Sequence, residues 1–213
     1  AQLSIPIATQ QIIFAAGVTC FYWMLGQIGT DAMAIGNVLV NIILIAILPG
    51  VGLGMATMTL VSESLGEKNL TLAFQWPHKV LRISLLIIGT FSMTVIAFPT
   101  IILQPFIHDP HLLSQAITPL RLDCIGVFFE VGAIIYMHAL NGADQTKVVA
   151  WSSSLLHVLF FLPLAYFFGI YLGLGLVGVW GMYVVFQIIQ LLTFVSVWQF
   201  RFHAFTQSKL TAK

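Results

Sequence analysis

Glu130 is the residue whose type and position most directly indicate chemistry. It lies in the middle of an apolar run, Cys124–Met137, that is expected to lie inside a lipid bilayer. A carboxylate at that depth costs about 2.5–3.5 kcal/mol on insertion scales. The carboxyl group must therefore be neutral or paired, and a proton or a bound cation can satisfy it. Glu130 thus predicts a proton or cation site, or an anchor for a cationic substrate.

Two other residues of this segment share the face of Glu130. Asp123 and Met137 lie seven residues to either side, which is close to two helical turns. The face would then carry an outer and a central carboxylate that could act as a relay or a cation site. The alternative is structural: Asp123 pairs with Arg121 or caps backbone, and Glu130 only joins helices.

Other polar and aromatic side chains at membrane depth are candidates for lining a substrate cavity. Buried amides either contact a substrate or form hydrogen bonds between helices, and aromatic rings can stack on an organic cation. A lone histidine can join a proton path, although it more often packs with a hydrogen bond. The cavity candidates are Gln10, Gln11, Asn37, Asn41, Tyr136, Met137 and His157.

Pro49 predicts a kink in one of the apolar helices, because proline removes a backbone donor. Gly50 and Gly54 follow it with the spacing of small residues that allow two helices to approach closely. A bendable helix suits alternating access, and kinked packing alone explains the pattern nearly as well.

The composition indicates an integral membrane protein. Of the 213 residues, 59% are hydrophobic and 7% are charged, with a mean hydropathy of +1.00. A net charge of +1 gives no electrostatic basis for binding nucleic acid. The residues show no spacing for a disulfide, a metal site or nucleophilic catalysis, so no enzyme activity and no cofactor beyond a coupling ion, H⁺ or Na⁺, is expected.

Windows of about 20 apolar residues predict an all-α fold with a single domain of six transmembrane helices. Segment 73–78 is expected to be a short interfacial segment or a loop. The chain starts at Ala1 rather than at methionine, and we expect it to be a fragment of a longer chain. The predicted spans are approximately 5–28, 33–62, 80–103, 119–140, 148–171 and 174–200.

Lysine and arginine predict the orientation, since they concentrate in cytoplasmic loops. With six spans, seven of the eight basic residues fall on one side and only Arg121 falls on the other. We therefore expect the carboxy-terminal tail to be cytoplasmic. The residues on that side are Lys68, Lys79, Arg82, Lys147, Arg201, Lys209 and Lys213.

Four motifs in this order resemble one lobe of a multidrug and toxic compound extrusion (MATE) transporter. They are Pro6–Ala8, Leu25–Ala34, Leu60–Gly66 and Ala139–Lys147. The resemblance implies a twelve-helix protein of two six-helix lobes, of which this chain is the carboxy-terminal one. It also implies that Glu130 occupies the place of an acidic residue in the fourth helix of that lobe. Phe14 stands where some members carry a glutamate, which leaves more of the cation role to Glu130.

The resemblance implies a secondary antiporter, in a bacterial inner membrane, that exports small organic cations in exchange for protons or sodium ions. Its partners would be the lipid bilayer, the cationic substrate and the missing amino-terminal lobe. Three alternatives remain. The chain could be a lipid-linked saccharide flippase of the same superfamily, which should carry more arginine and lysine at depth. It could be a non-transporting membrane assembly subunit. It could also be a complete small carrier that acts as a homodimer.

Overall fold

The computed structural model describes the backbone of residues 4–211 and the side chains of residues 12–201. The described chain is helical apart from short turns, which confirms the all-α prediction. The helices are α1 (Ser4–Ile28), α2 (Thr30–Gly66), α3 (Leu70–Ala97), α4 (Pro99–Leu103), α5 (Pro110–Gly142), α6 (Thr146–Leu155), α7 (Leu162–Tyr166) and α8 (Gly175–Thr211). Two π-helical segments, η1 (Leu156–Phe161) and η2 (Phe167–Tyr171), continue the rod of α6 and α7.

Four helical segments of the described chain are long and apolar enough to cross a membrane. They are Thr30–Gly66, Leu70–Ala97, Thr146–Tyr171 and Gly175–Arg201, and Ile12–Ile28 is a shorter apolar helix. Helix α5, which carries Glu130, is not among them. The count of six spans stays a prediction.

The expectation for segment 73–78 is wrong, because this segment is neither a loop nor a separate interfacial helix. It lies inside α3, which begins at Leu70, and only Glu67–Asn69 separate α2 from α3. The side chain of Asn69 accepts a hydrogen bond of 3.1 Å from the backbone N–H of Leu72 and so caps the helix. This cap extends α3 ten residues before the predicted start at position 80.

Helix α5 also begins earlier than the range 119–140 predicts. Its first residue is Pro110, and the side chain of Asp109 accepts a hydrogen bond of 2.8 Å from the backbone N–H of His111. Proline suits the first turn of a helix because its missing N–H would have no partner there. Pro119, which we expected to open the helix, lies inside it.

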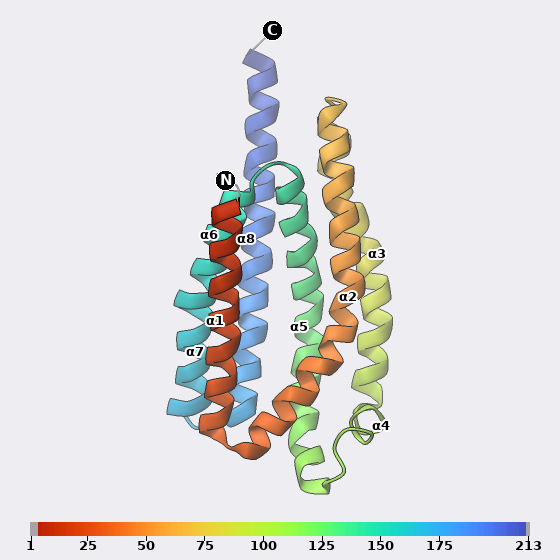
Figure 1. Ribbon diagram of the computed structural model, residues 1–213. Helices are drawn as coiled ribbons and strands as arrows, with labels where there is room; N and C mark the ends of the chain where they lie inside the picture. Colours follow the sequence, from red (N-terminus) through yellow and green to blue (C-terminus); the bar gives the residue numbers. More distant parts are fainter. Residues whose placement is uncertain (1–3, 212–213) are drawn as a thin grey trace.

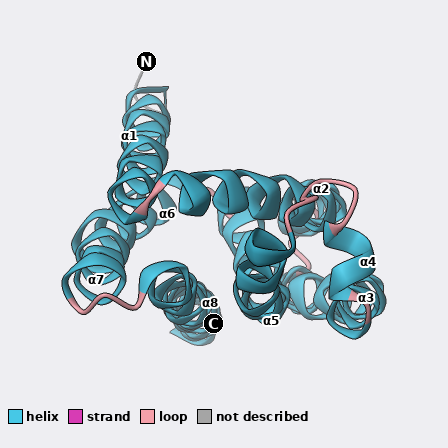
Figure 2. Cartoon of the chain, turned by 90° about the horizontal axis from the view of Figure 1, so that it is seen from below, coloured by secondary structure: helices cyan, strands magenta, loops and turns pink. Residues whose placement is uncertain are grey.

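All the long helices run between the two ends of the bundle (Figure 1). One end holds the α2–α3 turn, the α5–α6 turn and the carboxy-terminal part of α8, and the opposite end holds the α1–α2 and α7–α8 turns (Figure 1). The α7–α8 turn contains Gly173 and Gly175 at φ 68° and 58°, a conformation that glycine adopts without strain. Viewed along the bundle, α1, α6 and α7 lie on one side of α8, α3 and α5 lie on the other, and α2 crosses from the first side to the second (Figure 2).

Helix α2 crosses obliquely under the bundle before it straightens beside α3 and α5 (Figure 1). Pro49 lies inside this helix, as the predicted kink requires. A Cβ atom built on Gly50 would lie 2.8 Å from Cγ2 of Val131, and one on Gly54 would lie 2.8 Å from Nδ1 of His138. Both glycines therefore permit the close packing of α2 on α5, as their spacing predicts.

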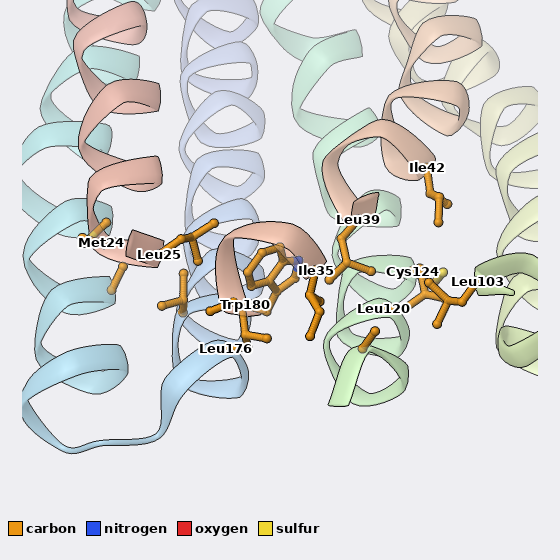
Figure 3. Packing of buried hydrophobic residues seen from close by; sticks show 14 of the residues in the cluster. Met24, Leu25, Ile35, Leu39, Ile42, Leu103, Leu120, Cys124, Leu176 and Trp180 are labelled. Carbon is orange, nitrogen blue, oxygen red and sulfur yellow. The ribbon is translucent and has the colours of Figure 1, made fainter. Parts of the chain in front are cut away.

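Buried residues form a continuous apolar core near the end that holds the α1–α2 turn. Trp180 of α8 lies in it between the side chains of α1 and α2 (Figure 3). A second cluster occupies the opposite end and includes Tyr136, Phe194 and Trp198. A third, smaller cluster joins the middle of α2, α3 and α5. Helix α5 contributes to all three clusters and is the central element that positions Glu130.

Candidate functional site

The carboxyl group of Glu130 is held by two side chains of α8. The hydroxyl of Tyr183 donates a hydrogen bond of 3.1 Å to Oε1 of Glu130. The amide of Gln187 lies against both the Glu130 carboxyl and the Tyr183 hydroxyl. The second carboxyl oxygen, Oε2, is buried and has no hydrogen-bond partner among the described residues. A buried polar atom without a partner is rare, and such an atom can mark a site for an ion.

Asp123 lies on the same side of α5 and is only 3% exposed. Its carboxyl group contacts the side chain of Trp180, whereas Arg121, the partner that the sequence allowed, is exposed. Asp123 also acts electrostatically on Glu130. The structure thus places the two predicted carboxylates near enough to interact electrostatically, and their roles in ion binding stay a prediction.

The partners of both carboxylates come from one face of α8. Trp180, Tyr183 and Gln187 are spaced by three and four residues, so they project from the same side of the helix. The seven-residue spacing of Asp123 and Glu130 on α5 matches this repeat. Sequence reasoning missed all three residues of α8, although a tyrosine and a glutamine four residues apart inside an apolar helix are a usable signal.

Two cavity candidates on α2 lie apart from this cluster. Asn37 and Asn41 are both exposed, and the side-chain amide of Asn41 donates a hydrogen bond of 2.7 Å to the backbone oxygen of Asn37. They therefore pair within one helix. Gln10 and Gln11 lie outside the residues whose side chains the structure describes.

Tyr136 is a core residue in this structure, which does not fit the predicted stacking on a substrate. It is 3% exposed, and its ring meets the ring of His78 edge-on at a centroid distance of 5.7 Å. Met137 is partly buried against the same cluster. The reason is that helix α3 extends far enough to cover this part of α5.

The two histidines at depth have different surroundings. Nδ1 of His138 lies 2.9 Å from the backbone oxygen of Ile134, in agreement with the packing role. His157 lies on η1, and its ring is surrounded by those of Phe14, Phe161 and Phe186 at centroid distances of 6.0, 5.3 and 5.5 Å. Nε2 of His157 is buried without a hydrogen-bond partner among the described residues.

Gly17 of α1 makes room for the ring of His157. A Cβ atom at this position would collide with Nε2 and Cδ2 of His157. We expect Gly17→Ala to lower the free energy of unfolding by about 1–3 kcal/mol, since the aromatic rings leave His157 little space to move. Thermal unfolding in detergent measures this effect. The double variant Gly17→Ala/His157→Ala should lose less than the sum of the two single variants, and strict additivity would contradict the contact.

A cavity of about 520 Å³ opens at the end that holds the α1–α2 turn. It is lined by that turn, by Ser114, Gln115 and Thr118 of α5, and by the first residues of α8. Neither Glu130 nor Asp123 lines it, so this cavity is distinct from the carboxylate cluster. Within the described residues there is no group of three or more His, Cys, Asp and Glu side chains that could hold a metal ion, and Cys20 and Cys124 are free thiols.

Relatives with similar sequences are named as a transporter or as probable multidrug resistance proteins. The MatE family model matches residues 6–167. An uncharacterized transporter of Bacillus subtilis (strain 168), YisQ, is 25% identical over 182 residues, which are 84% of this chain and 39% of the relative. A probable multidrug resistance protein, NorM of Mannheimia succiniciproducens, is 28% identical over 172 residues, which are 78% of this chain and 36% of the relative. The chain therefore spans less than half the length of these relatives.

Solved structures show the same fold. An outward-facing multidrug resistance MATE family transporter matches with a TM-score of 0.88 and 16% identity, over 95% of this chain and 46% of that one. A MOP superfamily transporter from Pyrococcus furiosus matches with a TM-score of 0.82 and 18% identity, over 90% of this chain and 42% of that one. The prediction that the fold is one lobe of a MATE-like transporter is confirmed. With a family model that covers most of its residues, this chain belongs to the MatE family.

Proposed function

We propose that this chain is the carboxy-terminal lobe of a secondary antiporter that exports organic cations in exchange for protons or sodium ions. The observation that carries the proposal is Glu130, a carboxylate whose buried Oε2 lacks any partner among the described residues. Relatives named as probable multidrug resistance proteins support the substrate class. The partner would be a second six-helix lobe, since the matched MATE chains are about twice as long.

The distribution of basic residues supports an orientation in the bacterial inner membrane. Lys68, Lys147 and Arg201 lie in or next to the α2–α3 turn, the α5–α6 turn and the distal part of α8, which share one end of the bundle (Figure 1). Positive residues favour the cytoplasmic side. This end, with the carboxy-terminal tail, would face the cytoplasm.

Exchange would follow from competition for one carboxylate. Glu130 can hold the coupling ion or the positive charge of the substrate, and binding of one releases the other. Rocking of this lobe against the second lobe would open the site alternately to the two sides of the membrane. Pro49 lies inside α2 and, because proline removes a backbone donor, gives the helix a place at which such a motion can be absorbed.

Transport by the full-length protein in liposomes tests this function. Liposomes loaded with a fluorescent organic cation are given a proton gradient or a sodium gradient, each imposed separately. We expect one of the two gradients to accelerate movement of the dye against its concentration, and collapse of that gradient to stop it. Movement that responds to neither gradient would contradict the antiport proposal. Empty liposomes and a neutral dye of similar size serve as controls.

A further inference from the structure

We propose that Tyr183 and Gln187 of α8 complete the ion site of Glu130, and that the ion taken by this three-residue site is a proton. This inference rests on the proposed antiport function and deepens it. Neither residue is predicted by the motifs of the chain, and both are brought to Glu130 by the packing of α8 on α5.

The three side chains leave two buried acceptor oxygens without a hydrogen bond from the described residues. The Tyr183 hydroxyl donates its hydrogen bond to Oε1 of Glu130, at 3.1 Å. Oε2 of Glu130 and Oε1 of Gln187 are both buried acceptors without a partner among the described residues. Gln187 is only 2% exposed, so bulk water does not reach it readily. One proton on Glu130 turns Oε2 into a donor, and a turn of the Gln187 amide would bring its oxygen to accept that hydrogen bond.

A hard metal cation fits this arrangement less well than a proton. Hard cations such as calcium and magnesium collect about six oxygen ligands. The cluster offers two carboxyl oxygens, one amide oxygen and one hydroxyl, of which the hydroxyl already donates to the carboxyl. Backbone oxygens inside α5 and α8 accept hydrogen bonds of the helices themselves. A proton needs only one donor atom and one acceptor.

The other groups around Glu130 leave the cluster isolated. Among the described residues, Asp123 of α5 and Tyr183 are the titratable groups that act on its carboxyl. Helices α2 and α3 also pack on this part of α5, and they present glycines there: Gly50 against Val131 and Gly89 against Phe128. The charge of Glu130 therefore depends on its burial, on Asp123 of α5 and on the two side chains that α8 offers it.

Tyr183 and Gln187 would have different tasks as positioning residues. The Tyr183 hydroxyl stabilises the ionised carboxylate, since a hydrogen bond to a charged acceptor is about twice as strong as one to a neutral acceptor. The Gln187 amide can present its NH₂ group to the carboxylate or its oxygen to the protonated acid. It can therefore serve both states of a site that loads and releases a proton in each cycle.

The test compares the pH dependence of cation efflux by the full-length protein and its variants in liposomes. Tyr183→Phe removes the donor to the carboxylate, so the proton is retained to higher pH. We expect the pH of half-maximal efflux to rise by about one to two units. Gln187→Leu removes the hydrogen-bond partner of both the ionised and the protonated Glu130 carboxyl. We therefore expect efflux to fall about tenfold or more at every pH. A sodium gradient without a pH difference should drive no efflux.

Control variants separate this inference from the proposed function. Tyr166→Phe and Gln190→Leu change the same residue types outside the cluster and should behave like the wild type.

If Glu130→Gln leaves efflux intact, the assignment of Glu130 as the antiport site is wrong. If Glu130→Gln stops efflux but Tyr183→Phe keeps the wild-type pH profile, only the role of α8 is overturned. Efflux driven by sodium overturns the choice of the proton. Thermal unfolding shows whether each variant is folded. If Gln187→Leu does not fold, the pH profile of Tyr183→Phe alone decides whether α8 contributes to the site.

Discussion

Glu130→Gln should abolish the exchange of organic cations for the coupling ion. Glutamine has nearly the shape of glutamate, but it carries no charge and exchanges no proton. The loss of a positioned proton-transfer group typically costs about 10²–10⁴-fold in rate. We therefore expect gradient-driven efflux to fall by about a hundredfold or more, to the level of empty liposomes. Dye efflux from liposomes, at matched amounts of reconstituted protein, measures the change.

The fold should survive this substitution, which makes the result interpretable. The oxygen of a glutamine side chain can still accept the hydrogen bond of 3.1 Å that Tyr183 donates to Oε1 of Glu130. Glu63→Gln removes an exposed carboxylate near the end of α2 and is the matched control. Glu130→Asp keeps the charge and should retain part of the activity. Undiminished coupled efflux in Glu130→Gln would overturn the assignment of Glu130.

Gly142→Leu should prevent α2 and α5 from packing at one end of the bundle. A Cβ atom on Gly142 would lie 2.5 Å from the backbone oxygen of Met58, and the side chain of Ser62 donates a hydrogen bond of 2.9 Å to the backbone oxygen of Gly142. The obstacle is backbone rather than a side chain, so rotation cannot relieve it. We expect a loss of about 3 kcal/mol or more in the free energy of unfolding, the upper range for overpacking.

Thermal unfolding of the purified protein in detergent, with a monitor of helicity, measures this loss. Gly66→Leu is the matched control, because Gly66 also ends a helix but a Cβ atom built there has no neighbour within 4 Å. It should leave the unfolding temperature within a few degrees of the wild type. Equal effects of the two substitutions would contradict the close approach of α2 and α5.

The helices and their breaks could be predicted because they depend on local properties. Apolar runs, Pro49 and the glycines of the α7–α8 turn act through hydropathy and backbone geometry, which are readable in one segment at a time. The errors arose at helix ends, where a single side chain decides. Asn69 and Asp109 cap α3 and α5, and each cap extends its helix beyond the apolar window.

The candidate site could be predicted only in part, because its partners come from another helix. The depth and the spacing of Asp123 and Glu130 are properties of α5 alone. The contacts with Trp180, Tyr183 and Gln187 depend on how α8 is turned against α5, which hydropathy does not specify. Likewise, Tyr136 was a plausible cavity residue until α3 covered it.

Two of the motifs on which the family resemblance depends meet at one point of the structure. Leu60–Gly66 ends α2 and Ala139–Lys147 spans the end of α5, and the hydrogen bond from Ser62 to the backbone oxygen of Gly142 joins them. Their residue types are therefore explained at least in part by packing. This separates them from Glu130, for which the described residues leave a buried oxygen unsatisfied.

The π-helical segment Leu156–Phe161 has a consequence for how this chain should be aligned with its relatives. A π turn holds more residues than an α turn, so it advances the register of the helix. Deleting one residue there would close the wide turn into an ordinary α turn, and the flanking residues would keep nearly the same facing, because the wide turn has already absorbed the extra residue. A one-residue gap at this place in an alignment therefore need not change which side chains face α1, and equivalence should be assigned by facing rather than by counting.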